Sequence, residues 1–253
     1  MSIPGETVSG DETCRGQRDG AETETLFVAY PALAQRITLL CGEASWSITG
    51  ASALVQDAEG AYYFELAKPK HWQKRPDGGV TVGVGAIGGS LRPGEGLLAC
   101  LQREAREEIG QALQVVSAAS THLVYEEALA ASLSLGQGEH PAPALCTIGR
   151  NRFRRQELPG REILVIVTFL ARVAAAPRPA DLFGLVRIPG PLVPAFFGAE
   201  ERPAEALRAW PHCELWTQAP LPSQAVLRPI WTARSLQVAL QAGRTMAEFG
   251  AGP

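Results

Sequence analysis

The sequence predicts an α/β domain built around a mixed β-sheet with helices on its faces. Strand-like and helical segments are interleaved along the chain, but without the regular strand-helix-strand alternation of a purely parallel sheet. The chain has 253 residues, 46% of them hydrophobic, which is enough for a sizeable core. We therefore expect one main domain, spanning residues 25–245.

The first expected elements are two strands joined by a tight turn. Residues 47–56 and 61–67 are short runs rich in β-branched and aromatic side chains, and residues 57–60 between them have the composition of a turn. This pattern predicts a β-hairpin. A basic loop follows, and residues 80–87 then return to the apolar character of a strand.

A helix is predicted for residues 96–109. Four of its apolar residues recur at the spacing of one stripe on a 3.6-residue helix: Leu98, Leu101, Ala105 and Ile109. Gly110 follows at the position where the C-terminal cap of a helix favours glycine. We expect the helix to pack on the core through this stripe.

Later segments continue the mixture of strands and helices. Residues 113–125 and 162–173 are predicted strands, and the nearly continuous apolar run of the second is typical of a strand covered on both faces. Residues 128–161 contain Pro, Gly and Arg and are too many for an ordinary connection, so they predict an insertion, a lid or a substrate loop. A last amphipathic helix is predicted for residues 231–241.

Both ends of the chain are expected to lie outside the domain. Residues 1–24 are polar and have no apolar period, which predicts a disordered, flexible N-terminal tail, and residues 246–253 are expected to form a short C-terminal tail. The N-terminus has no signal-peptide pattern, and no run of residues has the length of a membrane span. The five cysteines include no C-x-x-C pair. These features predict a cytoplasmic protein.

Three glutamates should project from one face of the predicted helix. Glu104, Glu107 and Glu108 stand at i, i+3 and i+4, so their like charges repel one another unless a divalent cation neutralises them. Carboxylate-rich coordination suits hard cations such as Mg²⁺ or Mn²⁺. An acidic helix face alone is more often simply solvated, so the surrounding sequence has to decide between the two interpretations.

The surrounding sequence, residues 89–110, is GSLRPGEGLLACLQREAREEIG. It resembles the Nudix box, a motif in which glycines, glutamates and an arginine recur at fixed intervals. All seven fixed positions are occupied, by Gly89, Glu95, Arg103, Glu104, Glu107, Glu108 and Gly110. The closing aliphatic position holds Gln111 instead, which affects local packing rather than metal binding.

The resemblance implies a Nudix-like α/β/α sandwich that hydrolyses a nucleoside diphosphate linked to a further moiety. By position, Glu104, Glu107 and Glu108 would be metal ligands and catalytic carboxylates, and the backbone carbonyl of Gly89 would be a further ligand. Mg²⁺ is the expected cofactor, with Mn²⁺ as a substitute. Cations of this kind stabilise the charge of the diphosphate and lower the pKa of an attacking water.

The resemblance also gives roles to residues that do not bind the metal directly. Glu95 and Arg103 would form an ion pair that braces the loop against the helix, and the alternative for Glu95 is a place in the metal shell. A general base could come from the box or from a loop outside it, and the loop candidates are Glu126, Glu127 and Glu162.

Substrate-binding residues are harder to predict, because they lie mostly outside the motif. Trp72 in the basic loop could stack on a base, while Arg92, Arg152 and Arg154 could bind phosphates. For the basic loop the alternative is simple solvation, and for the arginine-rich stretch it is a solubility role or a contact to a partner subunit.

Two functions remain after this reasoning. One is a pyrophosphohydrolase; the other is a non-catalytic Nudix-fold sensor that binds a nucleotide ligand without cleaving it. All four acids of the box are present, which favours hydrolysis. The formal net charge of -3 gives no pull toward nucleic acid or a membrane. We therefore expect a small nucleotide-type substrate as the partner, and a homodimer stays open.

Overall fold

The computed structural model describes residues 21–136, 138–151 and 162–249. The helices are α1 (Ala21–Ala29), α2 (Pro31–Cys41), α3 (Leu97–Ile109), α4 (Val193–Phe196) and α5 (Trp231–Gln241), with short 3₁₀ turns η1 (Pro69–His71), η2 (Gly190–Leu192) and η3 (Ala204–Ala209). None of the helices in the described ranges has the length and apolar content needed to cross a membrane.

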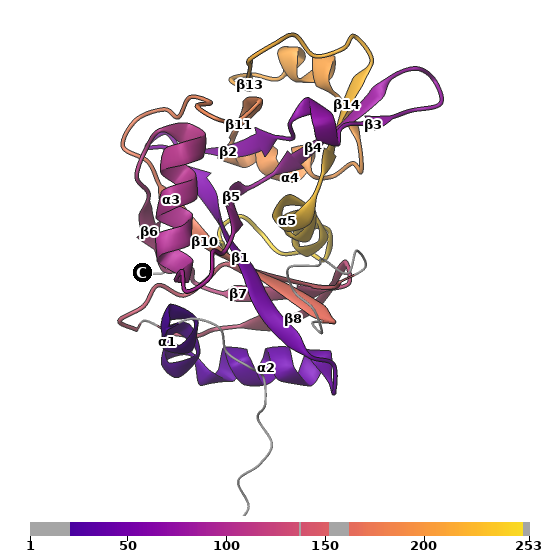
Figure 1. Ribbon diagram of the computed structural model, residues 1–253. Coiled ribbons are helices and arrows are strands. Elements are labelled where there is room, and N and C mark those ends of the chain that lie inside the picture. The colour runs from indigo at the N-terminus through magenta and orange to yellow at the C-terminus, as the bar shows by residue number, and fades with distance from the viewer. Residues whose placement is uncertain (1–20, 137, 152–161, 250–253) are drawn as a thin grey trace, which may run out of the picture.

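The strands form one mixed sheet (Figure 1). They are β1 (Trp46–Gln56), β2 (Ala61–Leu66), β3 (Gln73–Lys74), β4 (Val80–Gly85), β5 (Ile87–Ser90), β6 (Gln114–Val116), β7 (Thr121–Tyr125), β8 (Ala128–Leu133), β9 (Leu145–Arg150), β10 (Ile163–Arg172), β11 (Gly184–Pro189), β12 (Arg202–Pro203), β13 (Glu214–Thr217) and β14 (Ala225–Pro229). The main path runs β12-β14-β4-β2-β1-β10-β9-β7-β8. Parallel pairs join β1 to β10, β7 to β9 and β14 to β4, and the other pairs are antiparallel.

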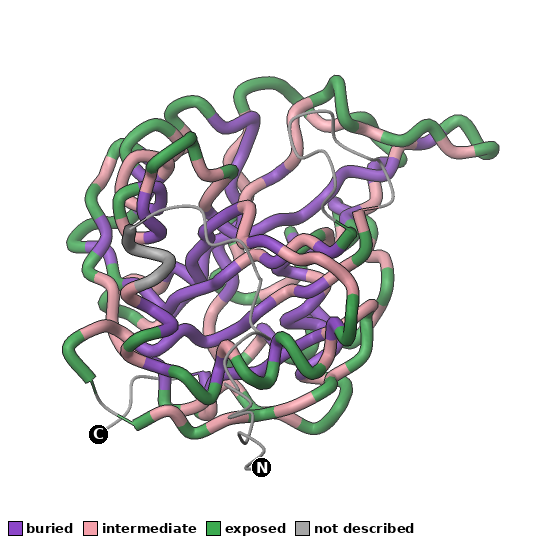
Figure 2. Tube along the Cα trace, turned by 60° about the horizontal axis from the view of Figure 1, so that its bottom comes forward, coloured by how far each residue is buried: buried purple, intermediate pink, exposed green. Residues whose placement is uncertain are grey.

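Helices cover both faces of this sheet, as the alternation of side chains along β1 shows. Ala51, Ala53 and Val55 belong to the buried cluster that includes the apolar side of α3, whereas Leu54 belongs to the cluster that includes α5. In Figure 1, α3 and α5 lie on opposite sides of β1. Figure 2 shows the buried residues gathered in the middle of the molecule, with exposed residues around them. The expected α/β/α sandwich around a mixed sheet is confirmed.

Several expected elements are present with close to the expected bounds. The predicted hairpin is β1 and β2, which pair antiparallel with Val55 opposite Tyr63. Helix α3 begins after Gly96 and ends at Gly110, whose φ of 68° is the left-handed conformation that glycine adopts most easily. The last predicted helix is α5, and the apolar run near residue 165 is the long strand β10.

Other expectations were wrong. The segment expected to be one strand is split into β6 and β7, and the expected insertion, residues 128–161, contains β8 and β9, which continue the sheet. Helix α1 begins at Ala21, inside the segment expected to be a tail. The expected C-terminal tail includes Phe249, which is fully buried and packs against the ring of His122. Met246 also packs against the same buried cluster, so residues 246–249 belong to the domain.

Candidate active site

Helix α3 presents two of its acidic residues to strand β5 on one face of the sheet. Cys100, Leu101 and Ala105 on its apolar side are fully buried, and this fixes how the helix is rotated about its own axis. Glu104 and Glu108 are four residues apart and therefore lie on the same side of the helix. Both face the glycine-containing strand β5, which pairs with β1.

Arg103 connects this helix to the loop that precedes it. Its guanidinium donates from Nε to Glu95 Oε1 at 2.7 Å and from Nη2 to Glu95 Oε2 at 2.8 Å. It also donates to Glu104 Oε1 at 2.7 Å and to the carbonyl of Ser90 at 3.2 Å. The hydrogen bond from Arg103 lowers the pKa of Glu95 to about 2, so this acid is firmly ionised. The structure therefore contains the ion pair that the motif predicts.

Two glycines of β5 contact the carboxylates of α3. The backbone N–H of Gly88 donates to Glu108 Oε2 at 3.0 Å. A Cβ atom on Gly89 would collide with the carboxylate of Glu104, so only glycine allows this close approach. The carbonyl oxygen of Gly89 accepts a weak hydrogen bond from Cys100 Sγ at 3.7 Å.

Glu65 on β2 is a further acid of this site, and sequence analysis missed it. Burial, and then the charge of Glu104, raise the pKa of Glu65 to about 7. Burial, and then the charges of Glu65 and Glu104, raise the pKa of Glu108 to about 9, although the N–H of Gly88 acts in the opposite direction. A signal was available, because Glu65 is the one charged residue within the apolar strand AYYFEL.

Glu107 does not join these three acids. It is about half exposed, and its oxygens lie 3.4 Å from Arg92 Nη2 and 3.3 Å from Arg103 Nη1. Within the described residues, no three His, Cys, Asp or Glu side chains are arranged to enclose a metal ion. Position i+3 of the helix thus turns toward the arginines while positions i and i+4 face β5, and the metal-ligand roles of Glu104, Glu107 and Glu108 stay a prediction.

The chemistry of this site nevertheless suits a hard divalent cation. The carboxylates of Glu65, Glu104 and Glu108 and the carbonyl of Gly89 are all oxygen donors. The charge of Glu104 helps to raise the pKa of both Glu65 and Glu108, and this is a repulsion that a bound cation would remove.

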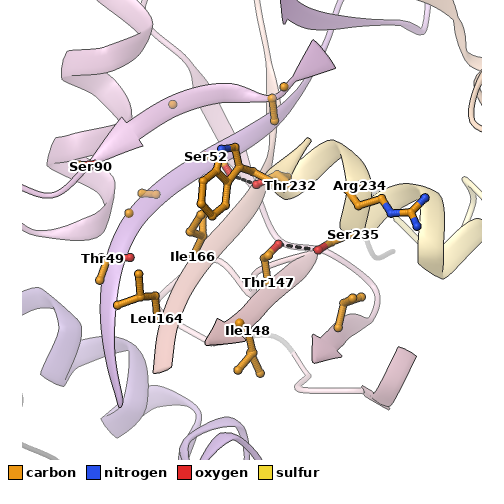
Figure 3. Close-up of a pocket in the computed structure, with 18 of the residues that line it drawn as sticks. Thr49, Ser52, Ser90, Thr147, Ile148, Leu164, Ile166, Thr232, Arg234 and Ser235 are labelled. Atoms are coloured by element: carbon orange, nitrogen blue, oxygen red, sulfur yellow. Dashed lines mark hydrogen bonds between the residues drawn. The ribbon is translucent and has the colours of Figure 1, made fainter. Parts of the chain in front are cut away.

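A pocket of about 360 Å³ lies beside Gly88 and Gly89. This volume is in the range of small-molecule sites, about 300–1,000 Å³. Residues from β1, β2, β5, β9, β10 and α5 line it, and Figure 3 shows several of them around the cavity. Glu65 lines the pocket. Glu104 and Glu108 do not line it, but they contact Gly89 and Gly88, which do.

Hydroxyl groups join the strands of this pocket to α5. Ser52 Oγ lies 2.9 Å from Thr232 Oγ1, and Thr147 Oγ1 donates to Ser235 Oγ at 2.8 Å (Figure 3). Ser52 Oγ is also 2.9 Å from Thr168 Oγ1 on β10. These buried contacts fix the beginning of α5 against the centre of the sheet.

The other candidate residues are divided between the pocket and the surface. Glu126 and Glu127 line the pocket, whereas Glu162 does not and instead accepts from the N–H of Ser45 at 3.1 Å. Arg92 is exposed beside Glu107, outside the pocket. Arg152 and Arg154 lie outside the described residues.

Trp72 does not lie in the pocket either. Its indole N–H donates to the carbonyl of Ala67 at 2.7 Å, and its ring packs edge-on against Phe183 at 5.1 Å between centroids. These contacts hold the side chain of Trp72 against the core. They correct the expectation that this ring stacks on the base of a substrate.

Residues 47–132 match the family model of the NUDIX domain. The chain contains a Nudix domain. The match includes the box and extends from β1 into β8, so the parts of the pocket formed by β9, β10 and α5 lie outside it. Nudix hydrolases cleave pyrophosphate bonds in nucleoside diphosphate derivatives and generally use divalent metals, and this is the chemistry that the domain implies.

Solved structures of several small proteins are similar to part of this chain. The ORF135 protein of E. coli is 14% identical, with a TM-score of 0.34, covering 61% of this chain and 81% of its own. The MutT protein of Methanosarcina mazei Go1 is 12% identical, with a TM-score of 0.33, covering 60% and 83%. The dihydroneopterin triphosphate pyrophosphohydrolase of E. coli is 11% identical, with a TM-score of 0.34, covering 58% and 84%. No curated protein matches the chain.

Proposed function

We propose that this protein is a Mg²⁺-dependent pyrophosphohydrolase that acts on a nucleotide or nucleotide derivative. One observation carries the proposal: a complete Nudix box holds Glu104 and Glu108 against the two glycines that border a pocket of small-molecule size. A domain that only bound a ligand would not need such a concentration of partly buried acid beside its pocket.

Glu65, Glu104 and Glu108 would hold the cation, with the carbonyl of Gly89 as a further ligand. Glu107 would have a secondary role in metal binding, because its contacts with Arg92 and Arg103 draw its carboxylate away from the other acids. Bound at this position, the cation would neutralise phosphate charge and make an attacking water more acidic. The glycines of β5 leave room for a diphosphate close to the carboxylates.

The remaining residues of the site orient the acids and receive the proton. Arg103 fixes Glu104 through a hydrogen bond of 2.7 Å, while its ion pair with Glu95 holds the loop that follows Ser90. Such positioning matters because small misplacements of reacting groups slow catalysis strongly. Glu126 and Glu127 line the pocket and are the two loop candidates for the general base.

A substrate panel tests the proposal. Nucleoside triphosphates, dinucleoside polyphosphates, nucleotide sugars and ADP-ribose would be incubated with Mg²⁺, and phosphate and nucleotide products measured. Glu108→Gln and Glu65→Gln should each lower kcat by about 100-fold or more, as expected for groups that act on the transition state. Glu205→Gln, on the exposed surface of η3, is the matched control and should have wild-type activity.

The cation assignment has its own measurement. Binding of Mn²⁺, followed by its electron paramagnetic resonance signal, should weaken in the Glu65→Gln and Glu108→Gln proteins but not in the control. Tight binding of a nucleotide by a wild-type protein that cleaves no member of the panel would instead support the sensor function and reject the enzyme.

We also infer a cytoplasmic location and a single domain. Cys41, Cys100, Cys146 and Cys213 are free thiols, which is usual in a reducing compartment. The buried clusters on the two faces of the sheet draw on residues from α1 through to Phe249, which supports one folding unit.

A further inference from the structure

Backbone strain in the described part of the chain is concentrated at the pocket. In the described ranges, four non-glycine residues have positive φ: Glu126 (47°), Glu127 (65°), His212 (58°) and Trp231 (49°). Three of the four, all but His212, line the pocket. At Glu126 and Glu127 the two-residue turn between β7 and β8 sets the positive φ, whereas Trp231 begins a helix and has no such turn. Positive φ is unfavourable for a residue with a large side chain, and strained residues cluster at ligand sites.

Trp231 combines this strain with exposure. Its surface is 51% accessible, whereas the other four tryptophans, all within the described ranges, are only partly exposed. A large aromatic ring at the wall of a pocket loses contact with water when a ligand covers it, and this contributes favourably to binding. Strain and exposure in one residue both point to a ligand contact.

A short chain of contacts links Trp231 to the acids of α3. Glu108 accepts from the N–H of Gly88, Gly88 pairs with Ser52 across the sheet, and Ser52 Oγ lies 2.9 Å from the hydroxyl of Thr232, the next residue after Trp231. Gly88 and Trp231 also line the same pocket, so a substrate whose diphosphate lay beside Gly88 has room to place its next group against Trp231.

The other strained segment contacts the same part of α5. Glu126 and Glu127 form the turn between β7 and β8, and Glu127 Oε2 lies 3.0 Å from Nη2 of Arg234. Arg234 is three residues after Trp231 in α5, and both residues line the pocket. This ion pair holds the strained turn against the first turn of α5.

The surfaces between these segments suit a flat ring. Ile148, Leu164 and Ile166 contribute apolar side chains to the pocket, and Thr49 and Ser90 add hydroxyl groups (Figure 3). Apolar walls with a few polar groups and one exposed indole are the combination that binds heteroaromatic rings, since every nucleobase has a face that can stack.

We propose that Trp231 is the stacking surface for the nucleobase of the substrate, and that the strained turn at Glu126–Glu127 forms the adjoining wall of this base site. The inference rests on the proposed function, because it takes the diphosphate to lie beside Gly88 and Gly89. Trp231 lies outside the NUDIX-domain match, so the domain itself assigns it no role.

Equilibrium binding tests the inference without catalysis. AMP, GMP and UMP, which have no pyrophosphate bond to cleave, would be titrated in the presence of Mg²⁺, with ribose 5-phosphate as a ligand that has the sugar and phosphate but no base. Trp231→Ala should raise the Kd of at least one nucleotide by about tenfold, since stacking on one aromatic side chain has about this effect. Trp231→Phe should lose less, and binding of ribose 5-phosphate should not change.

Leu39→Ala is the matched control, because Leu39 is also an exposed apolar residue but lies on α2. Trp231→Gly adds a test of strain: glycine tolerates positive φ, so this variant should keep the thermal midpoint of the wild type while losing nucleotide affinity. A large fall of the midpoint would show that Trp231 is a structural residue and would overturn the inference.

Turnover separates this inference from the proposed function. If wild type hydrolyses a nucleotide and Trp231→Ala has the same Kd and KM, the base site is wrong and the hydrolase stands. If Glu108→Gln abolishes hydrolysis while nucleotide binding still depends on Trp231, both are supported. The absence of saturable binding of all three nucleotides by the wild type would reject the base site whatever the activity.

Discussion

Replacing Glu95 with glutamine removes a charge from a nearly buried ion pair while keeping the shape of the side chain. The side chains of Glu95 and Arg103 are only 13% and 17% exposed, and two hydrogen bonds of 2.7 and 2.8 Å join them. A hydrogen bond to a charged group contributes about 1.5–3 kcal/mol, so we expect a loss of about 2 kcal/mol in the free energy of unfolding. For a domain of this size, that lowers Tm by about 4–8 °C.

The loss should also depend on pH in a defined direction. Arg103 lowers the pKa of Glu95 from 4.5 to about 2 in the folded protein. A folded-state pKa below the unfolded one stabilises the protein fully above the unfolded value, and this contribution disappears as pH falls through the folded value. The difference between wild type and Glu95→Gln should therefore be constant from pH 7 to pH 5 and shrink between about pH 4.5 and pH 2.

Urea unfolding followed by circular dichroism in EDTA measures both effects. The exposed Glu205→Gln variant again serves as the control and should unfold like the wild type at every pH. Equal stability of Glu95→Gln and wild type at pH 7, or a deficit that did not decrease in acid, would refute the view that this ion pair braces the loop against α3.

Two further predictions concern glycine and cysteine. Gly89→Ala should push the carboxylate of Glu104 away and lower kcat by about 100-fold, as expected for a displacement of the order of 1 Å at a catalytic group. Gly198→Ala is the control and should be neutral, because a Cβ there meets only ordinary contacts. Equal kcat values for the two variants would contradict the packing argument. In the folded protein at pH 8, peptide mapping after brief alkylation should find Cys213 modified before Cys146, because Cys146 is fully buried and burial raises its pKa to about 12. Faster modification of Cys146 would show that the core opens there.

The sequence was most informative where one local pattern decided the structure. The apolar stripe and Gly110 fixed the length and orientation of α3, and the box therefore predicted the ion pair between Glu95 and Arg103. The distribution of the acids was not predictable from spacing, because it depends on which side of α3 the arginines and β5 lie. Glu107 therefore separates from Glu104 and Glu108.

The missed features depend on contacts between distant segments. Strand β8 consists mainly of small residues, so the alternation between its exposed and partly buried positions is weak in the sequence, and its pairing with β7 is visible only in the fold. The position of Trp231 at the start of α5 was predicted, but its positive φ and its place in the pocket were not. Both depend on the contact between Thr232 and Ser52, which are far apart in the sequence.

The order in which the chain is made gives the contact between α5 and β1 a further consequence. All the box residues and the central strands precede β14 and α5 in the sequence. During synthesis, every acid of the site is therefore made before the part of the pocket that contains Trp231. Long-range contacts of this kind form late in folding. A nascent chain could therefore contain the complete motif and still be unable to select a substrate until α5 docks against Ser52.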